Sequence, residues 1–222
     1  RPKKDQPFYH ILEENEDRSV YIAYVSQQNL EKDNSNEPFT HPSVKLIFNG
    51  NDEEGNFIEG EYIVALLSEI FLKREVGATI VHDPRVIWAI QETVKRNSGT
   101  SIQSTTGHAF FKKKIRESNA IYGGEMSAHH YFRDFCFCDS GMIPWLIIVE
   151  FMSLQDLSLS EIIKCRRANF PSSGEINFQV RDCDIAMARI SENFGKDSVY
   201  KDFSDGLSLT FNDWRLNLRQ SQ

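Results

Sequence analysis

The stretch Tyr122-Gly123-Gly124-Glu125-Met126-Ser127-Ala128-His129 decides both the architecture of this chain and its candidate site. An apolar run ends at two glycines, which predicts a strand that closes in a sharp turn where the backbone comes close to a ligand. The residues that follow offer a carboxylate in Glu125, a hydroxyl in Ser127 and a titratable ring in His129. Together these groups are suited to hydrogen bonding with the vicinal hydroxyls of a sugar.

Upstream of this stretch, strand and helix signals alternate. The hydrophobic pattern predicts strands at 44–48, 79–81, 100–102 and 120–122, with helices at 62–72, 86–95 and 109–116 between them. Residues 49–55 are rich in Asn, Asp and Gly and predict a solvated hairpin turn. The βαβα order is typical of a layered α/β domain.

Downstream, Ser140 is placed to cap a helix that runs through Trp145 towards Met152, with Pro144 in its first turn. A further helix over 161–167 leads to Phe170-Pro171-Ser172-Ser173-Gly174, the predicted inter-domain hinge. Beyond the hinge we expect strands at 176–180, 207–211 and 214–218 and a helix over 184–193. The polar segment 1–43 contains a plausible strand at 20–25 and a loop at 31–38.

The stretch from Gly124 to His129 resembles the sugar-binding loop of the α-D-phosphohexomutases. Its surroundings, including Asp139-Ser140-Gly141-Met142-Ile143-Pro144-Trp145, are similar to the bacterial phosphomannomutase branch. The likeness runs from about Gly55 to Trp145, then more thinly through 170–177 and 205–211. It covers the third domain and the opening of the fourth domain of a four-domain enzyme.

This resemblance divides the chain into three parts. Residues 1–43 form a divergent N-terminal segment without family likeness, residues 44–155 the sugar-binding third domain, and residues 156–222 the hinge and a truncated fourth domain. The expected fold is α/β, a layered α/β third domain followed by a partial α+β fourth domain.

The resemblance also implies a chemistry. Family members are isomerases that move a phosphoryl group between the C1 and C6 oxygens of a hexose, using a phosphoserine in the first domain and a magnesium loop of aspartates in the second. Neither element is recognisable here, and the position expected for the magnesium loop, 42–46, holds no acidic residue. We therefore expect the isolated chain to be catalytically incomplete. Magnesium and a hexose bisphosphate activator are expected only for a full family enzyme, and no cofactor in this chain.

The family's site residues carry over to named positions in this sequence. Gly124, Glu125, Ser127 and His129 match the sugar-binding loop, while His108 and Arg85 match catalytic positions near the phosphates. Two alternatives stay open: the histidine as a cap of the helix that follows it, and the arginine as a solvated side chain at a helix start. Some relatives carry lysine at the arginine position, and the two cations are not equivalent.

Arg219 and Ser221 resemble the start of a phosphate-binding loop in the fourth domain. Arginine and hydroxyl donors suit a phosphate by charge and by hydrogen bonding. However, Gln222 stands where the family has asparagine. A frayed C-terminal tail is the alternative interpretation.

A metal site is not favoured. The segment 125–139 is dense in possible ligands, but Cys136-Phe137-Cys138 lacks the two-residue spacing of a structural zinc site, and no second such pair exists. In the acidic turn at 49–55, the glycine that would match a calcium loop places Gly50 where the first acidic ligand belongs. We therefore expect no metal in this chain.

Composition limits the partners. The chain has 222 residues and a formal net charge of -7, which argues against nonspecific nucleic-acid binding because a phosphate backbone is held largely by Lys and Arg. No apolar run is long enough to cross a membrane, and four cysteines are too few for a disulfide framework in a chain of this length. We expect a cytoplasmic protein whose ligand is a hexose phosphate, either mannose or glucose phosphate. The missing mutase domains, or a second copy of the chain, are the expected protein partners.

Two function classes remain open at this point. The chain is either a portion of a phosphohexomutase that holds the hexose during phosphoryl transfer, or a noncatalytic phosphosugar-binding or protein-interaction module derived from a mutase. The presence of a serine-nucleophile domain in the upstream reading frame would distinguish them.

Overall fold

The computed structural model describes residues 51–85, 87–174, 176 and 178–220, together with the backbone of 21–25 and 44–48. In the first part of the chain, β1 (Tyr21–Val25) pairs antiparallel with β2 (Val44–Phe48). Both strands lie within one residue of their predicted positions. The predicted loop at 31–38 lies outside the described residues.

A five-stranded mixed sheet forms the centre of the molecule. Its order is β4 (Thr100–Gln103), β3 (Thr79–His82), β5 (Tyr122–Gly124), β6 (His130–Phe132) and β7 (Cys138–Asp139). The first three strands run parallel to one another, and the last two are added antiparallel. Parallel pairing requires the crossover helices that the sequence predicts between these strands.

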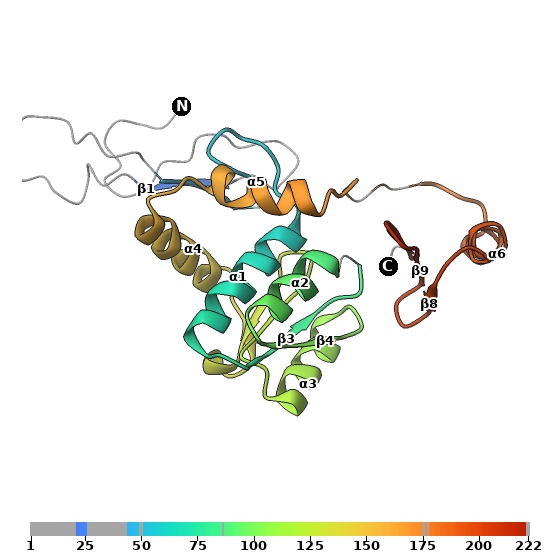
Figure 1. Cartoon of the computed structure of the whole chain (residues 1–222), viewed down its shortest axis with the longest axis horizontal. Helices are drawn as coiled ribbons and strands as arrows, with labels where there is room; N and C mark the ends of the chain where they lie inside the picture. The colour runs from blue at the N-terminus through green and yellow to red at the C-terminus, as the bar shows by residue number, and fades with distance from the viewer. Residues whose placement is uncertain are drawn as a thin grey trace, which may run out of the picture.

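Helices cover both faces of this sheet (Figure 1). The larger core joins one face to α1 (Gly60–Arg74), α2 (Trp88–Arg96), α4 (Met142–Gln155) and α5 (Leu159–Asn169). The opposite face is covered by α3 (His108–Ser118), whose Phe111 and Ile115 pack beneath Val81 and Tyr131. The predicted α/β fold class is therefore confirmed, as a three-layer domain.

Local signals explain where two helices begin. Ser158 and Glu161 form a reciprocal capping box at the start of α5. The Ser140 hydroxyl accepts a hydrogen bond from the Ile143 amide at 3.3 Å, and Pro144 lies in the first turn of α4 as predicted. Because Leu159, Ile162 and Ile163 join the main core, α5 packs on the third-domain body.

Three local predictions need correction, and the first concerns the glycine pair. Gly123 and Gly124 lie inside β5 and make no turn; the turn that follows is made by Ala128, with φ 66°. A Cβ on Gly123 would lie 2.5 Å from Ile115 of α3, and one on Gly124 would lie 2.7 Å from Val64 of α1. Glycine suits both positions because side chains of the two helices pack directly on the strand backbone.

The second correction concerns 176–180, where no strand forms at the described residues. Ile176, Phe178 and Val180 are exposed, and no described strand pairs with them, so their backbone groups have no ladder to join. The third concerns the turn predicted at 49–55, whose described part, 51–55, is not fully solvated. Asp52 is buried and its carboxylate accepts the amides of Glu54 and Asn56, at 3.1 and 2.8 Å.

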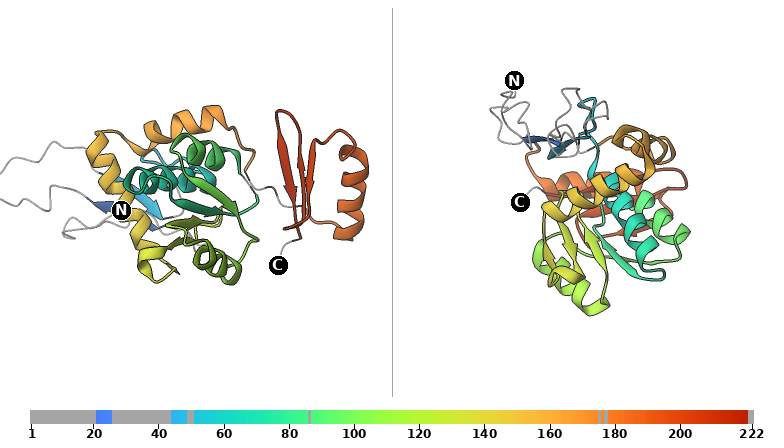
Figure 2. Two further views of the ribbon diagram at one scale, coloured as in Figure 1. Left: turned by 60° about the horizontal axis from the view of Figure 1, so that its bottom comes forward. Right: turned by 90° about the vertical axis from the view of Figure 1, so that its left-hand side faces the viewer.

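The C-terminal part is a small α+β unit, separated from the main body by an extended segment (Figure 2). It contains α6 (Cys183–Phe194) and an antiparallel sheet of β8 (Tyr200–Asp202), β9 (Leu207–Thr210) and β10 (Arg215–Leu218), in the order β10-β9-β8. Its buried core consists of Leu207, Leu209 and Phe211. No helix among the described residues is long and apolar enough to span a membrane.

Candidate functional site

The candidate site lies at the carboxyl edge of the three parallel strands. β3 leads into 83–85, β4 into 104–107 and β5 into the loop 125–129, with β3 in the middle. Since parallel strands end at one edge of their sheet, these three segments converge there. Ligands of open α/β sheets bind outside this edge.

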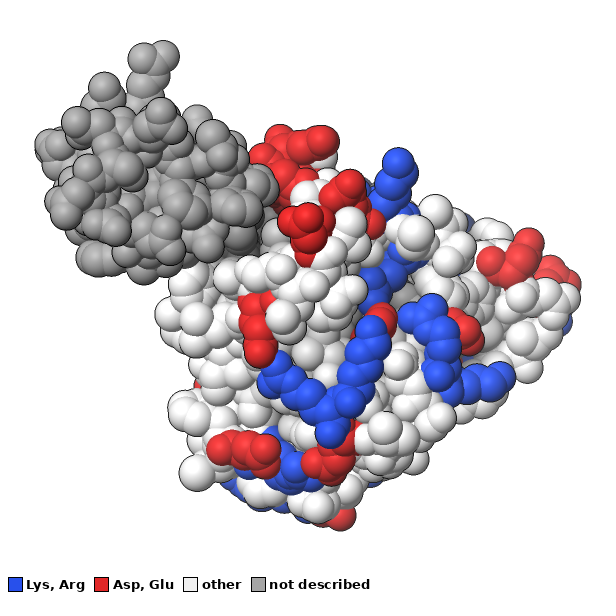
Figure 3. Space-filling view, turned by 60° about the vertical axis from the view of Figure 1, so that its left-hand side comes forward, with Lys and Arg blue, Asp and Glu red and all other residues white. Residues whose placement is uncertain are grey.

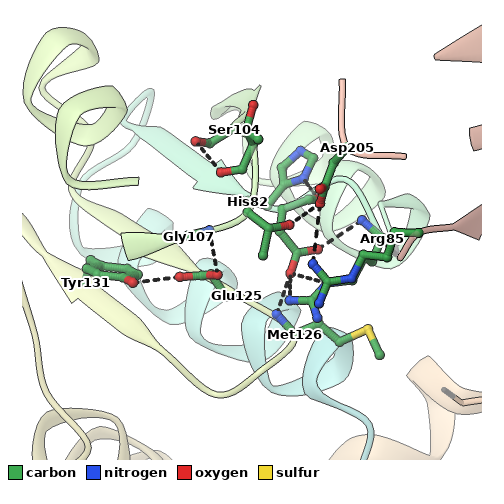
Figure 4. Close-up of polar contacts among 12 residues, drawn as sticks. His82, Arg85, Ser104, Gly107, Glu125, Met126, Tyr131 and Asp205 are labelled. Carbon is green, nitrogen blue, oxygen red and sulfur yellow. Dashed lines mark hydrogen bonds and ion pairs between the residues drawn. The ribbon is translucent and has the colours of Figure 1, made fainter. Parts of the chain in front are cut away.

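Glu125, the predicted sugar ligand, is almost fully enclosed. Only 2% of the residue is exposed, and its carboxylate lies between Tyr131 and Gly107 (Figure 4). The Tyr131 hydroxyl donates to Oε1 at 2.6 Å, and the Gly107 amide donates to Oε2 at 3.3 Å. Burial, and then the hydrogen bond to this carboxylate, raise the pKa of Tyr131, so its hydroxyl remains a donor. A carboxylate has about four acceptor positions, so Glu125 retains capacity for a further donor.

The rest of the loop is open to solvent. Ser127 and His129 are both exposed, and the loop is closed by hydrogen bonds from the Glu125 amide to the His129 carbonyl, at 2.9 Å, and from the Ala128 amide to the Glu125 carbonyl, at 3.1 Å. Nδ1 of His129 lies 3.9 Å from Oδ2 of Asp139 on β7. The hydroxyl and the imidazole are therefore the accessible polar groups of this loop, while Gly124 is buried in the strand below it.

Arg85 is not a solvated side chain at a helix start. Its side chain is 9% exposed, and Nε and Nη2 donate to Oδ2 of Asp83 at 3.0 and 2.5 Å. The helix that follows begins at Trp88. The same Oδ2 atom accepts the Met126 amide at 2.8 Å, so Asp83 joins the arginine to the start of the loop 125–129. Figure 4 shows Arg85 and Met126 lying close together at this point.

His108 is the first residue of α3 and is exposed. It does not cap the helix: the N-cap is Gly107, and the cap makes no side-chain hydrogen bond. Gly107 has φ 116°, a conformation that favours glycine, and its amide faces Glu125. The structure thus places the histidine beside the carboxylate's amide donor, at the helix N-terminus, where backbone amides favour a negative charge.

The C-terminal sheet meets this site through Asp205. Its carboxylate accepts a hydrogen bond from the Thr106 hydroxyl and lies 3.8 Å from Nη1 of Arg219. In addition, Nη1 of Arg215 on β10 donates to the Arg85 carbonyl at 2.6 Å. These contacts bring Arg219 to the same side of the molecule as the third-domain loops, whereas Ser221 lies outside the described residues.

Two buried histidines near this edge belong to the core. His130 lies 2.7 Å from the Tyr122 hydroxyl, and burial lowers the pKa of His130 to about 4. His82 is held by the Asp83 carbonyl and the Ser101 hydroxyl, each at 2.8 Å, and burial lowers its pKa as well. Both rings are therefore neutral near pH 7. Within the described residues, no group of three or more His, Cys, Asp or Glu side chains is arranged to hold a metal ion.

Sequence reasoning missed the residues that organise the site. Asp83 contacts Met126, 43 positions away, and Tyr131 contacts Glu125, 6 positions away. Thr106 contacts Asp205, 99 positions away. An aspartate before a proline and a tyrosine in an aromatic run have ordinary structural interpretations. No local pattern distinguishes them from such residues.

Comparison with protein-family models gives two matches. Residues 59–170 match the model described as phosphoglucomutase/phosphomannomutase, alpha/beta/alpha domain III. Residues 1–55 match a second model, described as hemimethylated DNA-binding protein YccV like. The N-terminal segment thus carries a likeness that the sequence alone did not reveal, to a family other than the mutases. Its divergence from the mutases reflects similarity to a different family.

Full-length relatives support the first match. The chain is 52% identical over 170 residues to a phosphomannomutase of Escherichia coli K12 and 53% identical over 171 residues to one of Vibrio cholerae. It is 49% identical over 170 residues to a protein of Xanthomonas campestris named phosphohexose mutases. Each alignment covers 77% of this chain but only 37–38% of the relative. The chain thus spans less than two fifths of these relatives' length.

Solved structures show the same fold. A phosphoglucomutase/phosphomannomutase family protein from Burkholderia thailandensis superposes with a TM-score of 0.61 at 23% identity, covering 79% of this chain and 39% of that one. A putative phosphomannomutase from Thermus thermophilus gives a TM-score of 0.57 at 15% identity, covering 75% and 36%. At these identities the comparison supports the architecture alone.

Proposed function

Because the chain belongs to the phosphoglucomutase/phosphomannomutase family through its α/β/α domain III, we propose that it binds the hexose of a hexose phosphate at the carboxyl edge of β3, β4 and β5. In a complete enzyme, this domain would hold the sugar while a phosphoryl group moves between the C1 and C6 oxygens. The observation that carries the proposal is the convergence of Arg85, the Gly107–His108 helix start and the loop 125–129 at one edge.

The polar groups at this edge suit the two ends of a hexose phosphate. Exposed Ser127 and His129 offer a hydroxyl and an imidazole to sugar hydroxyls, while the amides at the start of α3 and the Arg85 guanidinium attract a phosphate. Glu125 retains acceptor positions but is buried, so a sugar hydroxyl reaches them only if the long 3.3 Å contact with Gly107 opens to give access. We assign Glu125 to shaping the loop first and to accepting a sugar hydroxyl second.

Binding by the chain alone should be weak. Hydrogen bonds to neutral hydroxyls gain little over water, and most phosphate ligands of the family are not recognisable in this sequence. We expect a dissociation constant on the order of millimolar, about -4 kcal/mol. NMR titration with mannose 1-phosphate should shift the amides of 123–129, and Ser127→Ala together with His129→Ala should remove most of the affinity.

The matched control is Ser153→Ala, because Ser153 is an exposed serine on α4 whose hydroxyl, within the described part of the chain, bonds only to the Val149 carbonyl of its own helix. This variant should bind as the unmodified chain does. Saturable shifts that map away from 123–129, or that persist unchanged in the double variant, would place the sugar elsewhere.

We further propose that the chain by itself does not interconvert hexose phosphates. No nucleophilic serine of the family is recognisable, and positioning of the transferring phosphoryl requires groups from other domains. A coupled assay with mannose 1-phosphate, magnesium and a hexose bisphosphate should give no turnover above buffer. Turnover that copurifies with the chain would contradict this. A noncatalytic module would also show no turnover. The presence of a serine-nucleophile domain in the upstream reading frame would distinguish the two function classes.

The N-terminal match raises a second candidate function, binding of hemimethylated DNA by residues 1–55. This segment has six Lys and Arg residues against eleven Asp and Glu residues, a balance that weakens attraction to a phosphate backbone. Figure 3 shows one face of the described residues, on which acidic and basic side chains are interspersed, so this face offers no uniformly basic surface to a duplex. We therefore rank DNA binding below hexose phosphate binding. A gel-shift titration with hemimethylated and unmethylated duplexes tests it.

A further inference from the structure

Asp83 is the point at which two parts of the candidate site meet. It directly follows β3, is 2% exposed, and accepts four hydrogen bonds through its two carboxylate oxygens. Oδ1 accepts the Arg85 amide at 3.0 Å. Oδ2 accepts Nε and Nη2 of Arg85, at 3.0 and 2.5 Å, and the Met126 amide at 2.8 Å.

This arrangement leaves the arginine with one defined free side. Two of its guanidinium nitrogens are held by Asp83, and its carbonyl accepts Nη1 of Arg215 at 2.6 Å. Among the described residues, none accepts a hydrogen bond from Nη1 of Arg85. An anion can therefore bind along that side without breaking the pair with Asp83, since a guanidinium has five N–H donors in a fixed plane.

The bond to Met126 gives the carboxylate a second role. Met126 is the residue between Glu125 and Ser127, so its amide sets where the loop leaves β5. Here the same oxygen fixes the arginine and the loop at once.

We propose that Asp83 is a positioning residue that holds the phosphate-facing side of Arg85 and the sugar-binding loop 125–129 in one geometry. This rests on the proposed function and deepens it: the class of ligand is a hexose phosphate that spans both parts. Neither mannose nor inorganic phosphate spans the arginine and the loop, so the affinity for each should depend on Asp83 much less than the affinity for mannose 1-phosphate does. The test compares Asp83→Asn with Asp52→Asn in the full chain. Asp52 is equally buried, at 2%, and its carboxylate also accepts local backbone amides.

Affinity is read from NMR titrations with mannose 1-phosphate, mannose and inorganic phosphate. Asp83→Asn should weaken the affinity for mannose 1-phosphate about tenfold, as expected for loss of one charge-assisted contact. Asp52→Asn should change that affinity less than twofold. In an Arg85→Gln background, Asp83→Asn should weaken the affinity for mannose 1-phosphate by less than about threefold, because the arginine that Asp83 positions is gone. A full tenfold loss in both backgrounds, or none in either, would overturn the proposal.

A measurement on the unmodified chain covers the case in which Asp83→Asn does not fold. The Arg85 Nε–H signal should be protected from exchange, and it should shift with mannose 1-phosphate in parallel with the Met126 and Ser127 amides. If the three signals titrate with different midpoints, the arginine and the loop are not one unit and the positioning role fails. If the chain shows no saturable shift at 123–129 at all, the proposed function fails first, and the two failures are thereby distinguished.

Discussion

Three fully buried tyrosines allow the strength of the Glu125 contact to be measured against internal standards. The hydroxyls of Tyr131, Tyr62 and Tyr122 face three different acceptors. These are the Glu125 carboxylate at 2.6 Å, the Phe170 carbonyl at 2.5 Å and the His130 ring at 2.7 Å, respectively. Replacing each tyrosine by phenylalanine removes one hydroxyl while keeping the ring that packs in the core.

The acceptors predict different costs. A neutral hydrogen bond contributes about 1 kcal/mol to stability, and one to a charged group about 1.5–3 kcal/mol. Tyr131→Phe also leaves a buried carboxylate with only the 3.3 Å amide of Gly107, so we place its cost near the upper end, at about 3 kcal/mol. The Phe170 carbonyl is only partly buried and regains water, so Tyr62→Phe should cost about 1 kcal/mol.

Urea unfolding followed by circular dichroism gives both values. The expected difference of about 2 kcal/mol corresponds to a melting temperature lower by roughly 4–8 °C for Tyr131→Phe than for Tyr62→Phe, at this chain length. In a Glu125→Gln background, the cost of Tyr131→Phe should fall to about 1 kcal/mol, since the acceptor is then neutral. Equal costs for the two tyrosines, or a cost unchanged by Glu125→Gln, would refute the argument.

Three further predictions follow from the same structure. Burial raises the pKa of Glu61, whose two carboxylate oxygens have no partner within hydrogen-bond distance among the described residues, so the folded state binds more protons and loses stability as pH rises from the ordinary glutamate range through that raised pKa. Glu61→Gln should therefore flatten the pH dependence of unfolding and stabilise the chain at pH 7 by about 1 kcal/mol; an unchanged pH profile contradicts this. Gly124→Ala should destabilise by about 1–3 kcal/mol in denaturant unfolding, because its Cβ would lie 2.5 Å from the Tyr122 hydroxyl and 2.7 Å from Val64; a neutral result would mean that α1 shifts freely. Hydrogen exchange should be slow in α1 and fast in α6, which buries no residue, and equal protection would show that the C-terminal unit is a stable domain in its own right.

Much of the main sheet could be predicted because its helices are long enough to show a period, and the strands lie between them. The predicted alternation from 62 to 122 matches α1, β3, α2, β4, α3 and β5 to within a few residues. β5 also has only three residues, but the helix before it and the glycine pair at its end mark it. β6, β7 and β8 contain three, two and three residues, too few for an alternating pattern, and no such glycine pair marks them. The strand expected at 176–180 fails for the opposite reason: its apolar residues suit a strand, but a strand needs a partner, which composition does not supply.

The segments that form the site could be predicted, but the contacts between them could not. Resemblance identified Arg85, His108 and the loop 125–129, and their predicted roles in catalysis and binding stay predictions. That Glu125 is enclosed by Tyr131, or that Arg85 is held by a carboxylate that also fixes Met126, depends on how β3 and β5 lie side by side. Such contacts follow from strand register, which no local pattern in the sequence encodes.

The absence of side chains from Gly123 and Gly124 has a consequence for how accurately the loop beyond them is held. Packed side chains accommodate small disturbances by exchanging rotamers, and a helix resting on such side chains can shift with them. On β5, Ile115 of α3 and Val64 of α1 rest on main-chain atoms from opposite sides, and main-chain atoms have no rotamers to exchange. The last two residues before Glu125 thus have no side chain of their own to rearrange, so we expect the start of the loop to follow the positions of α1 and α3 closely.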